Sequence, residues 1–230
     1  MKRYDHILLD ADNTLFDFDL AEHEALKRAM TERGYEFTEE AEQRYLSINR
    51  SLWAAFDRGE VEQKWLVVER FRRFDAELGG SHDPAEFNAD YLTYLGQSSI
   101  LFPGAEEFCK TLFEAGCTLA IATNGVARVQ HARMDACPIA PYISHLFISE
   151  ELKAQKPQPE FFTPALEQMG ITDKSRCVMV GDNLRSDVLG GLNAGLTSVW
   201  YNPKGLDNTT DIVPTFTVSD YDTLKELILE

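Results

Sequence analysis

Short apolar segments recur along the chain in the pattern of strands that are buried on both faces of a sheet. They are rich in Ile, Leu, Val and aromatic residues and do not alternate regularly with polar positions. We expect five strands, at residues 4–9, 118–122, 145–148, 177–180 and 198–201. Helix-like segments, including a short one at residues 186–195, separate the last four strands. This alternation predicts an α/β fold built on a doubly wound parallel sheet.

The first two expected strands are separated by a long stretch in which no segment looks like a strand. Residues 17–98 show helical periodicity interrupted by glycines. These helices can belong to one continuous domain or form a bundle inserted after the first strand. We favour an inserted α-helical cap domain over residues 17–98, because the segment is long enough for a small core of its own. Residues 1–16 and 99–230 then form the α/β core.

Polar and reactive side chains gather where the expected strands end. Because parallel strands bring their carboxyl ends to one edge of a sheet, the loops that follow them lie close together. The first strand is followed by Asp10 and Asp12, and the fourth by Asp182 and Asp187. The loops after the second and third strands supply three further polar residues: Thr123, Asn124 and Lys156.

The acids among these residues favour a metal site. A pair of nearby carboxylates such as Asp10 and Asp12 is, taken alone, more often a solvated loop feature. Acids forced to the end of a buried strand, however, need a cation or a proton to be tolerated. Asp10, Asp12 and Asp182 at one sheet edge provide the oxygen ligands that Mg²⁺ prefers.

Four short motifs occur in an order that resembles the haloacid dehalogenase superfamily. They are DADNT at residues 10–14, ATNG at 122–125, KP at 156–157 and GDNLRSD at 181–187. The resemblance extends from the start of the chain to about residue 216, and the helical insert lies where that family places its cap. It implies a Rossmann-like core, a helical cap and a Mg²⁺-dependent hydrolase.

The resemblance also implies a role for each matched acid. Asp10 is expected to attack phosphorus and form an aspartyl-phosphate, while Asp12 acts as proton donor and then as proton acceptor. Mg²⁺ is expected between the Asp10 carboxylate, the Asp12 main-chain carbonyl and Asp182. Asp187 is expected either to support the metal through water or to orient Lys156.

The other motif residues are expected to bind the phosphoryl group or to support the site. Thr123 and the Asn124 amide would bind phosphoryl oxygens, and Lys156 would add a fixed positive charge. Thr14 is expected to be a supporting residue. Lys153, which lies in place of a glycine often found before the third motif, is a minor rival of Lys156.

Asp12 bears on the type of reaction. A halide leaves without a proton, whereas the leaving oxygen of a phosphate ester needs one, so a dehalogenase has no use for Asp12. We therefore expect a phosphomonoester hydrolase that acts on a small-molecule phosphate ester. A sugar-phosphate mutase has the same motifs and stays open. A relative that binds phosphate without turnover also stays open, although the intact motifs argue against it.

A closer likeness is to bacterial pyrimidine 5'-nucleotidases, which are house-cleaning nucleoside monophosphatases of the same superfamily. It rests mainly on residues 49–53 with Phe56 and Gly59, and less on segments 148–151 and 190–196. A nucleotidase acting on pyrimidine nucleoside monophosphates is therefore expected, with a phosphatase of sugar phosphates or other small metabolites as the alternative.

Some residues of the insert are candidates for contact with a nucleotide. Trp53, Phe56 and Trp65 can stack a base, although aromatic residues at helical spacing more often form a core. Asn49 and Arg50 can contact base or sugar, or face solvent.

The composition is that of an ordinary folded protein with an acidic surface. The 230 residues carry a formal net charge of −16, which disfavours nucleic acid polymers and anionic membranes as partners. The four cysteines form no CxxC pair, the N-terminus does not resemble a signal peptide, and no apolar run approaches a membrane span. We expect a cytoplasmic protein with reduced thiols. Nothing in the sequence specifies an oligomeric state.

Overall fold

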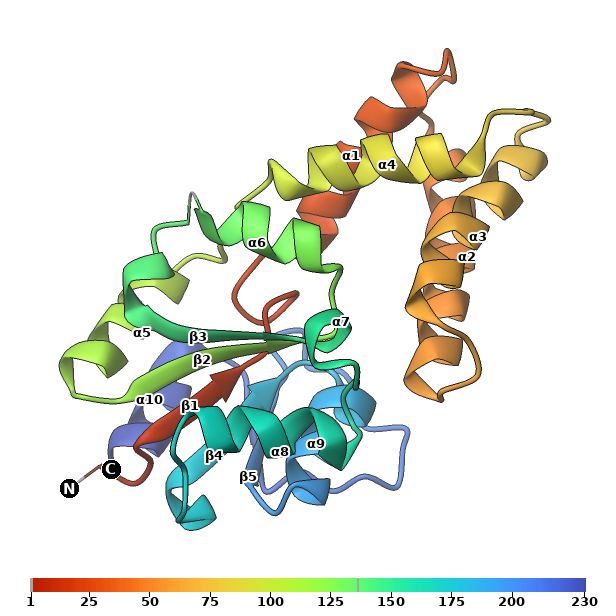
Figure 1. Ribbon diagram of the computed structural model, residues 1–230. Helices are drawn as coiled ribbons and strands as arrows, with labels where there is room; N and C mark the ends of the chain where they lie inside the picture. The colour runs from red at the N-terminus through yellow and green to blue at the C-terminus, as the bar shows by residue number, and fades with distance from the viewer. Residues whose placement is uncertain (1, 136) are drawn as a thin grey trace. The chain divides into compact units, whose positions relative to one another are not determined.

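A six-stranded sheet forms the centre of the computed structural model, which describes residues 2–135 and 137–230 (Figure 1). Neighbouring strands pair in parallel in the order β3-β2-β1-β4-β5-β6. The strands are β1 His6–Leu9, β2 Thr118–Thr123, β3 Ile143–Ile148, β4 Cys177–Gly181, β5 Thr197–Tyr201 and β6 Phe216–Val218. The predicted α/β class with a doubly wound parallel sheet is confirmed.

All five predicted strands are present, but β6 was missed. β6 has three residues, and Thr217 at its centre is exposed, so its sequence contains no buried apolar run. It pairs only with β5, at the edge of the sheet, where short and partly polar strands are common. The omission of β6 does not change the predicted site, because the loops that carry the candidate catalytic residues follow other strands.

Helices cover both faces of the sheet in this unit. They are α5 Ala105–Glu114, α6 Ala127–Asp135, α7 Ser149–Leu152, α8 Pro159–Gln168, α9 Leu189–Asn193 and α10 Tyr221–Leu229, with single turns η1 Ala140–Tyr142, η2 Lys174–Arg176 and η3 Leu184–Val188. The short helix predicted over residues 186–195 is present, but it begins at Leu184 with the π-helical turn η3 and continues as α9 to Asn193. The Asn183 side chain begins that turn by accepting hydrogen bonds from the Arg185 and Ser186 amides.

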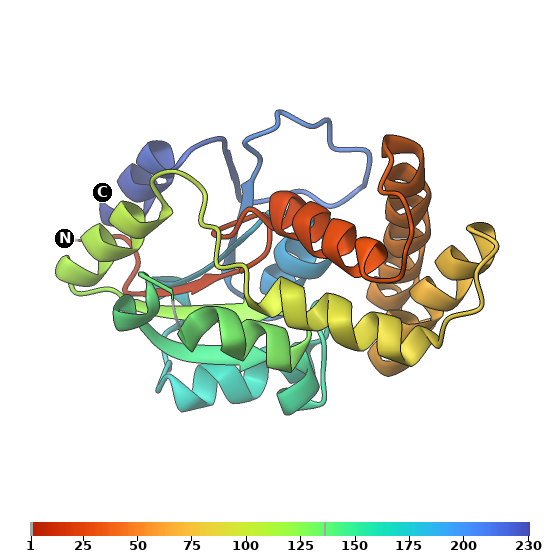
Figure 2. The same cartoon turned by 90° about the horizontal axis from the view of Figure 1, so that it is seen from above.

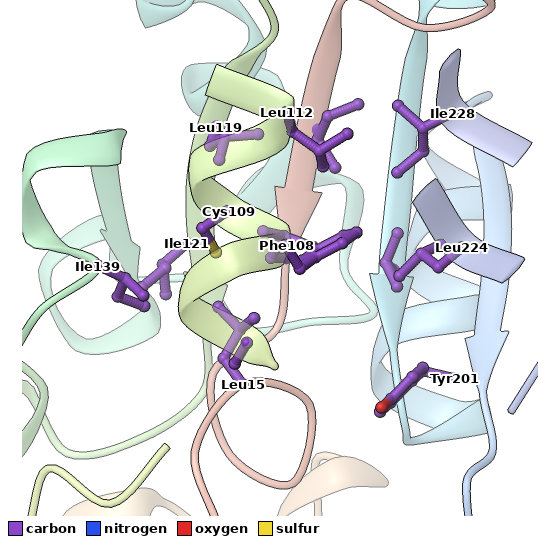
Figure 3. Close-up of a cluster of buried hydrophobic side chains, with 14 of the residues drawn as sticks. Leu15, Phe108, Cys109, Leu112, Leu119, Ile121, Ile139, Tyr201, Leu224 and Ile228 are labelled. Carbon is purple, nitrogen blue, oxygen red and sulfur yellow. The ribbon is translucent and has the colours of Figure 1, made fainter. Parts of the chain in front are cut away.

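Successive residues of β1 enter two separate apolar cores, one on each face of the sheet. Ile7 and Leu9 belong to the core formed with α5 and α10, where Phe108 and Leu224 face the strands (Figure 3). Leu8 belongs to the core on the other face, with Phe161 of α8. Because neighbouring strand residues point to opposite faces, a strand covered on both sides is apolar throughout. This packing holds the carboxyl ends of the strands, and the loops that follow them, in fixed positions.

The chain forms two compact units, one made of the residues up to Phe18 with Ser99–Glu230 and the other of Asp19–Ser98. The helices of the second region are α1 Phe18–Thr31, α2 Glu39–Asp57, α3 Gln63–Glu77 and α4 Pro84–Gly96. α1 lies beside α4 (Figure 2), and Arg33, two residues after α1, forms an ion pair at 2.7 Å with Asp90 of α4. Aromatic rings fill the interior of this unit: Tyr45, Phe71, Phe74, Phe87 and Tyr91.

Among the described residues, no helix combines the length and the apolar character that crossing a membrane requires.

Candidate active site

Three carboxylates meet at the carboxyl edge of the sheet. Asp10 directly follows β1, Asp182 directly follows β4, and Asp187 lies in η3. The Asp10 amide donates to the Val180 carbonyl at 2.9 Å, which continues the pairing of the two strands into the loop. One oxygen of each carboxylate lies within 4.8 Å of the others. The structure thus brings together Asp10 and Asp182 from opposite ends of the sequence, as a shared cation requires.

A buried lysine lies against two of these acids. The Lys156 side chain is only 1% exposed, and its Nζ donates to Asp10 Oδ1, Asp187 Oδ1 and the Ala122 carbonyl, each at 2.6 Å. Lys153, the predicted minor rival, instead ends α7 in a left-handed conformation with φ 56°. Lys156 is therefore the lysine of the acidic cluster.

The charges of this cluster do not cancel. Three carboxylates face one ammonium, which leaves an excess of two negative charges when all groups are ionised. Burial, followed by the charge of Asp187, raises the pKa of Asp10 well above its ordinary value and that of Asp182 to about 8. Burial alone would lower the pKa of Lys156, but Asp10 and Asp187 raise it above its ordinary value. A divalent cation held by carboxylate oxygens fits this donor set and charge.

Asp12 lies in the loop after β1 and is held by a different set of groups. Its Oδ2 accepts a hydrogen bond from Gln130 Nε2 at 2.9 Å, and its Oδ1 accepts one from the Arg133 guanidinium. Both donors lie on α6, and both side chains are buried. The Asp12 side chain itself is 24% exposed, so it remains accessible to a substrate.

The loop that carries Asp12 is a tight turn. Asn13 has φ 58°, a left-handed conformation in which asparagine is tolerated better than most residues. The Leu15 and Phe16 amides both donate to the Ala11 carbonyl at 2.9 Å. Thr14 is fully buried, and its carbonyl accepts a hydrogen bond from the Tyr221 hydroxyl at 2.6 Å. Thr14 therefore anchors the turn to α10 through its main chain.

The second motif lies beside the third. Thr123 is buried, and its hydroxyl accepts a hydrogen bond from the Gly125 amide at 2.9 Å. The Asn124 side chain bonds both main-chain groups of Lys156, donating to its carbonyl at 3.0 Å and accepting from its amide at 2.9 Å. This amide thus ties together the loops after β2 and β3. The predicted contact of Thr123 and Asn124 with phosphoryl oxygens stays a prediction.

Comparison with known proteins agrees with this arrangement. The sequence profile of the haloacid dehalogenase-like hydrolase family matches residues 4–195. The chain belongs to this family. The predicted family and enzyme class, a phosphoric monoester hydrolase, are confirmed.

Relatives of this haloacid dehalogenase-like hydrolase match it over its full length. The chain is 34% identical to pyrimidine 5'-nucleotidase PynA of Streptococcus pneumoniae, over 98% of this chain and 95% of the relative. It is also 34% identical to pyrimidine 5'-nucleotidase YjjG of Escherichia coli, over 98% of both. The crystal structure of the HAD-hydrolase YfnB from Bacillus subtilis bound to magnesium superposes with a TM-score of 0.93 at 31% identity, over 99% of both chains. The predicted likeness to bacterial pyrimidine 5'-nucleotidases is confirmed.

Two side chains of the site were missed by the sequence reasoning. Gln130 and Arg133 are polar residues in a short helix, and such residues usually face solvent. The available signal was their spacing of three, which places both on one face of a helix that begins just after the second motif. This face of α6 contacts Asp12 of the first motif, and the contact is visible only in the folded structure.

Proposed function

We propose that this protein is a Mg²⁺-dependent phosphomonoesterase that acts through an aspartyl-phosphate on Asp10 and hydrolyses pyrimidine nucleoside 5'-monophosphates. The observation that carries the proposal is the buried Asp10 carboxylate, which lies in an acidic cluster with an excess of negative charge and against one fixed ammonium. Such a cluster suits a cation and a phosphate dianion better than it suits a structural role.

Asp10 has the geometry of a nucleophile. Its Oδ1 is fixed by Lys156 at 2.6 Å, which leaves its second oxygen to attack phosphorus. The Lys156 ammonium lowers the repulsion between this carboxylate and a negatively charged phosphoryl group. Water then hydrolyses the aspartyl-phosphate and regenerates Asp10.

Mg²⁺ would be held by the carboxylates of Asp10 and Asp182 and by the main-chain carbonyl of Asp12. When bound, it would offset the excess negative charge and polarise the phosphoryl oxygens. Asp187 is better placed to orient Lys156 than to bind the metal, because Oδ1 accepts from Lys156 at 2.6 Å and Oδ2 from the Asn183 amide at 3.0 Å.

Asp12 is proposed as the acid and base of the reaction. Asp12 lies two residues after the nucleophile and is partly exposed. A remaining lone pair of its carboxyl group can therefore reach a leaving oxygen. Asp12 would protonate the leaving group in the first step and accept a proton from water in the second. Thr123 and Asn124 are proposed to border the phosphoryl group.

The unit Asp19–Ser98 is proposed as a cap that selects the substrate. The nucleotidases PynA and YjjG match across this unit as well as the core, which supports a nucleotide as substrate. Among the residues considered for base contact, Asn49 and Phe56 are buried within the unit and serve its own core. Arg50 and Trp65 are exposed and Trp53 is half-buried, so these three remain candidates for a nucleotide.

A substrate screen tests this proposal. Nucleoside monophosphates and hexose phosphates are compared by phosphate release with Mg²⁺ and with EDTA. We expect dUMP and dTMP to be hydrolysed faster than hexose phosphates, only with Mg²⁺. Asp10→Asn should lower activity by roughly 10⁴-fold or more, whereas the matched surface variant Asp222→Asn should be unchanged.

The outcomes separate the parts of the proposal. Faster hydrolysis of hexose phosphates would replace the nucleotidase assignment by a sugar phosphatase. Equal activity of Asp10→Asn and the unaltered protein would refute the nucleophile.

A further inference from the structure

We propose that Gln130 and Arg133 of α6 are positioning residues that hold the Asp12 carboxylate in the orientation needed for proton transfer. The inference rests on the proposed phosphatase function and adds to it a role for α6. Neither residue belongs to the four motifs, and both lie on α6, which follows the second motif.

Each Asp12 oxygen is bound by one donor from the same face of one helix. Gln130 Nε2 donates to Oδ2 at 2.9 Å, and the Arg133 guanidinium donates to Oδ1. Residues three apart on a helix lie side by side, so the two donors form a fork that matches the two carboxylate oxygens. A carboxylate bound at both oxygens cannot rotate freely, yet each oxygen keeps a further lone pair for a proton.

The fork is itself rigid. Arg133 is fully buried and Gln130 is 1% exposed, so neither side chain has room for another rotamer. The guanidinium lies over the rings of Phe16 and Phe18, 5.5 and 5.6 Å from their centroids. The Ser99 hydroxyl donates to the Arg133 carbonyl at 2.9 Å. Asp12 is thus oriented by groups whose own positions are fixed by packing.

Gly125 of the second motif provides the space that Gln130 needs. A Cβ atom at position 125 would lie 2.2 Å from Gln130 Nε2, far inside van der Waals contact. The backbone of Gly125 does not require glycine by its dihedral angles, since its φ is not positive. The same Cβ atom would lie 3.1 Å from Thr123 Oγ1, so Gln130 Nε2 is its nearest neighbour and Gly125→Ala displaces the Gln130 amide first.

Orientation matters most in the step that breaks the ester bond. As Asp10 forms its bond to phosphorus, the phosphorus–oxygen ester bond breaks, its electron pair moves to the leaving oxygen, and that oxygen takes the Asp12 proton. The 5'-oxygen of a nucleoside needs this proton, whereas p-nitrophenolate is stable as an anion and leaves without it. A misplaced Asp12 should therefore slow nucleotides selectively.

The test compares kcat/KM for the fastest nucleoside monophosphate and for p-nitrophenyl phosphate. This parameter covers steps up to formation of the aspartyl-phosphate, so the later use of Asp12 as a base does not enter. In Gln130→Ala, Arg133→Lys and Gly125→Ala, we expect kcat/KM for the nucleotide to fall roughly 10- to 100-fold and that for p-nitrophenyl phosphate to change far less. His131→Ala, on the exposed face of the same helix, is the matched control and should change neither.

Two results would overturn the inference: an equal loss on both substrates in folded variants, or no loss on either. Gly125→Ala and Gln130→Ala carry the test if Arg133→Lys does not fold. A variant with Gly125→Ala and Gln130→Ala together should lose no more than Gln130→Ala alone, because the glycine acts through that amide. Failure of the phosphatase proposal is recognised separately, since the unaltered protein would then release no phosphate from either substrate in the presence of Mg²⁺.

Discussion

Buried polar groups occur in both units of the chain, and the two sets differ in their balance of charge. The acid–lysine cluster of the α/β core comprises Asp10, Asp182, Asp187 and Lys156. The helical network of the other unit comprises Glu22, Asn49, Arg70 and Asn88. The first set has three acids for one base, whereas the second has one of each.

The helical network is internally complete. Asn49 donates to Glu22 at 2.8 Å and accepts from Arg70 at 3.2 Å, so its amide bridges the two charges. Arg70 also donates to Asn88 at 3.0 Å, and its guanidinium lies 4.7 Å from the centroid of the Tyr91 ring. Burial raises the pKa of Glu22 to about 7, against the opposing charge of Arg70. All of these groups find their partners within the unit.

This difference distinguishes the buried charges of the helical network, which are paired within the fold, from those of the acid–lysine cluster, which we propose bind a cation. Burial and a raised pKa occur in both sets, so neither feature by itself marks a site. When all groups are ionised, an excess of two negative charges distinguishes the acid–lysine cluster, and either protons or a cation must offset it. The following changes test whether this distinction holds.

The largest effect on stability is expected from Arg70→Met, which removes the only cation of the helical network. The uncompensated Glu22 and the unpaired amides should lower the free energy of unfolding by about 3–5 kcal/mol, measured by urea denaturation at neutral pH. The double variant Arg70→Met with Glu22→Gln should recover part of the loss, because no buried charge remains unpaired. A double variant no more stable than Arg70→Met would contradict the charge argument.

A second large effect is expected from Lys156→Met, this time on catalysis. Loss of the fixed ammonium should lower kcat/KM for a nucleoside monophosphate by about 10²- to 10³-fold, because a preorganised charge beside the phosphoryl group is gone. Steady-state kinetics with saturating Mg²⁺ measures the change. Lys225→Met, on the surface of α10, is the control and should behave as the unaltered protein. A loss of less than twofold in Lys156→Met would remove this residue from the site.

Mg²⁺ should stabilise the protein, and more so as the pH rises. Because folding raises the pKa of Asp182 to about 8, its protonated form stabilises the metal-free protein below about pH 4, and this stabilisation is lost as the pH rises through about 8. Mg²⁺ binds the deprotonated cluster, so its effect on Tm should grow from about pH 6 to about pH 8. At a hundred times its Kd the gain is about 2.7 kcal/mol. A gain that is independent of pH, or equal in Asp182→Asn, would contradict this.

The smallest effect is expected from Glu22→Gln. The amide keeps an oxygen that can accept from Asn49, so stability at low pH should change little. In the unaltered protein the stabilisation due to protonated Glu22 is complete below about pH 4.5 and is lost as the pH rises through about 7. Glu22→Gln should flatten the dependence of unfolding free energy on pH over this range. An unchanged pH dependence would show that Glu22 does not titrate there.

The sequence predicted the parts of the molecule that depend on strands. A strand covered on both faces of the sheet appears in the sequence as an apolar run. The residues that follow such strands, for example Asp10 and Asp182, meet at one sheet edge because the strands are parallel. Contacts made by helical side chains were not predicted. No role was expected for Gln130 and Arg133, and Asn49 was expected to contact a nucleotide or to face solvent, because the helix face that is covered depends on tertiary packing.

Binding of Mg²⁺ measured by titration calorimetry at about pH 8 tests the central claim, that the charge excess of the acid–lysine cluster is a cation site. We predict that one ion binds per chain, that binding is lost in Asp182→Asn, and that it is retained in Glu22→Gln. Undiminished binding in Asp182→Asn, or no binding by the unaltered protein, would contradict the account.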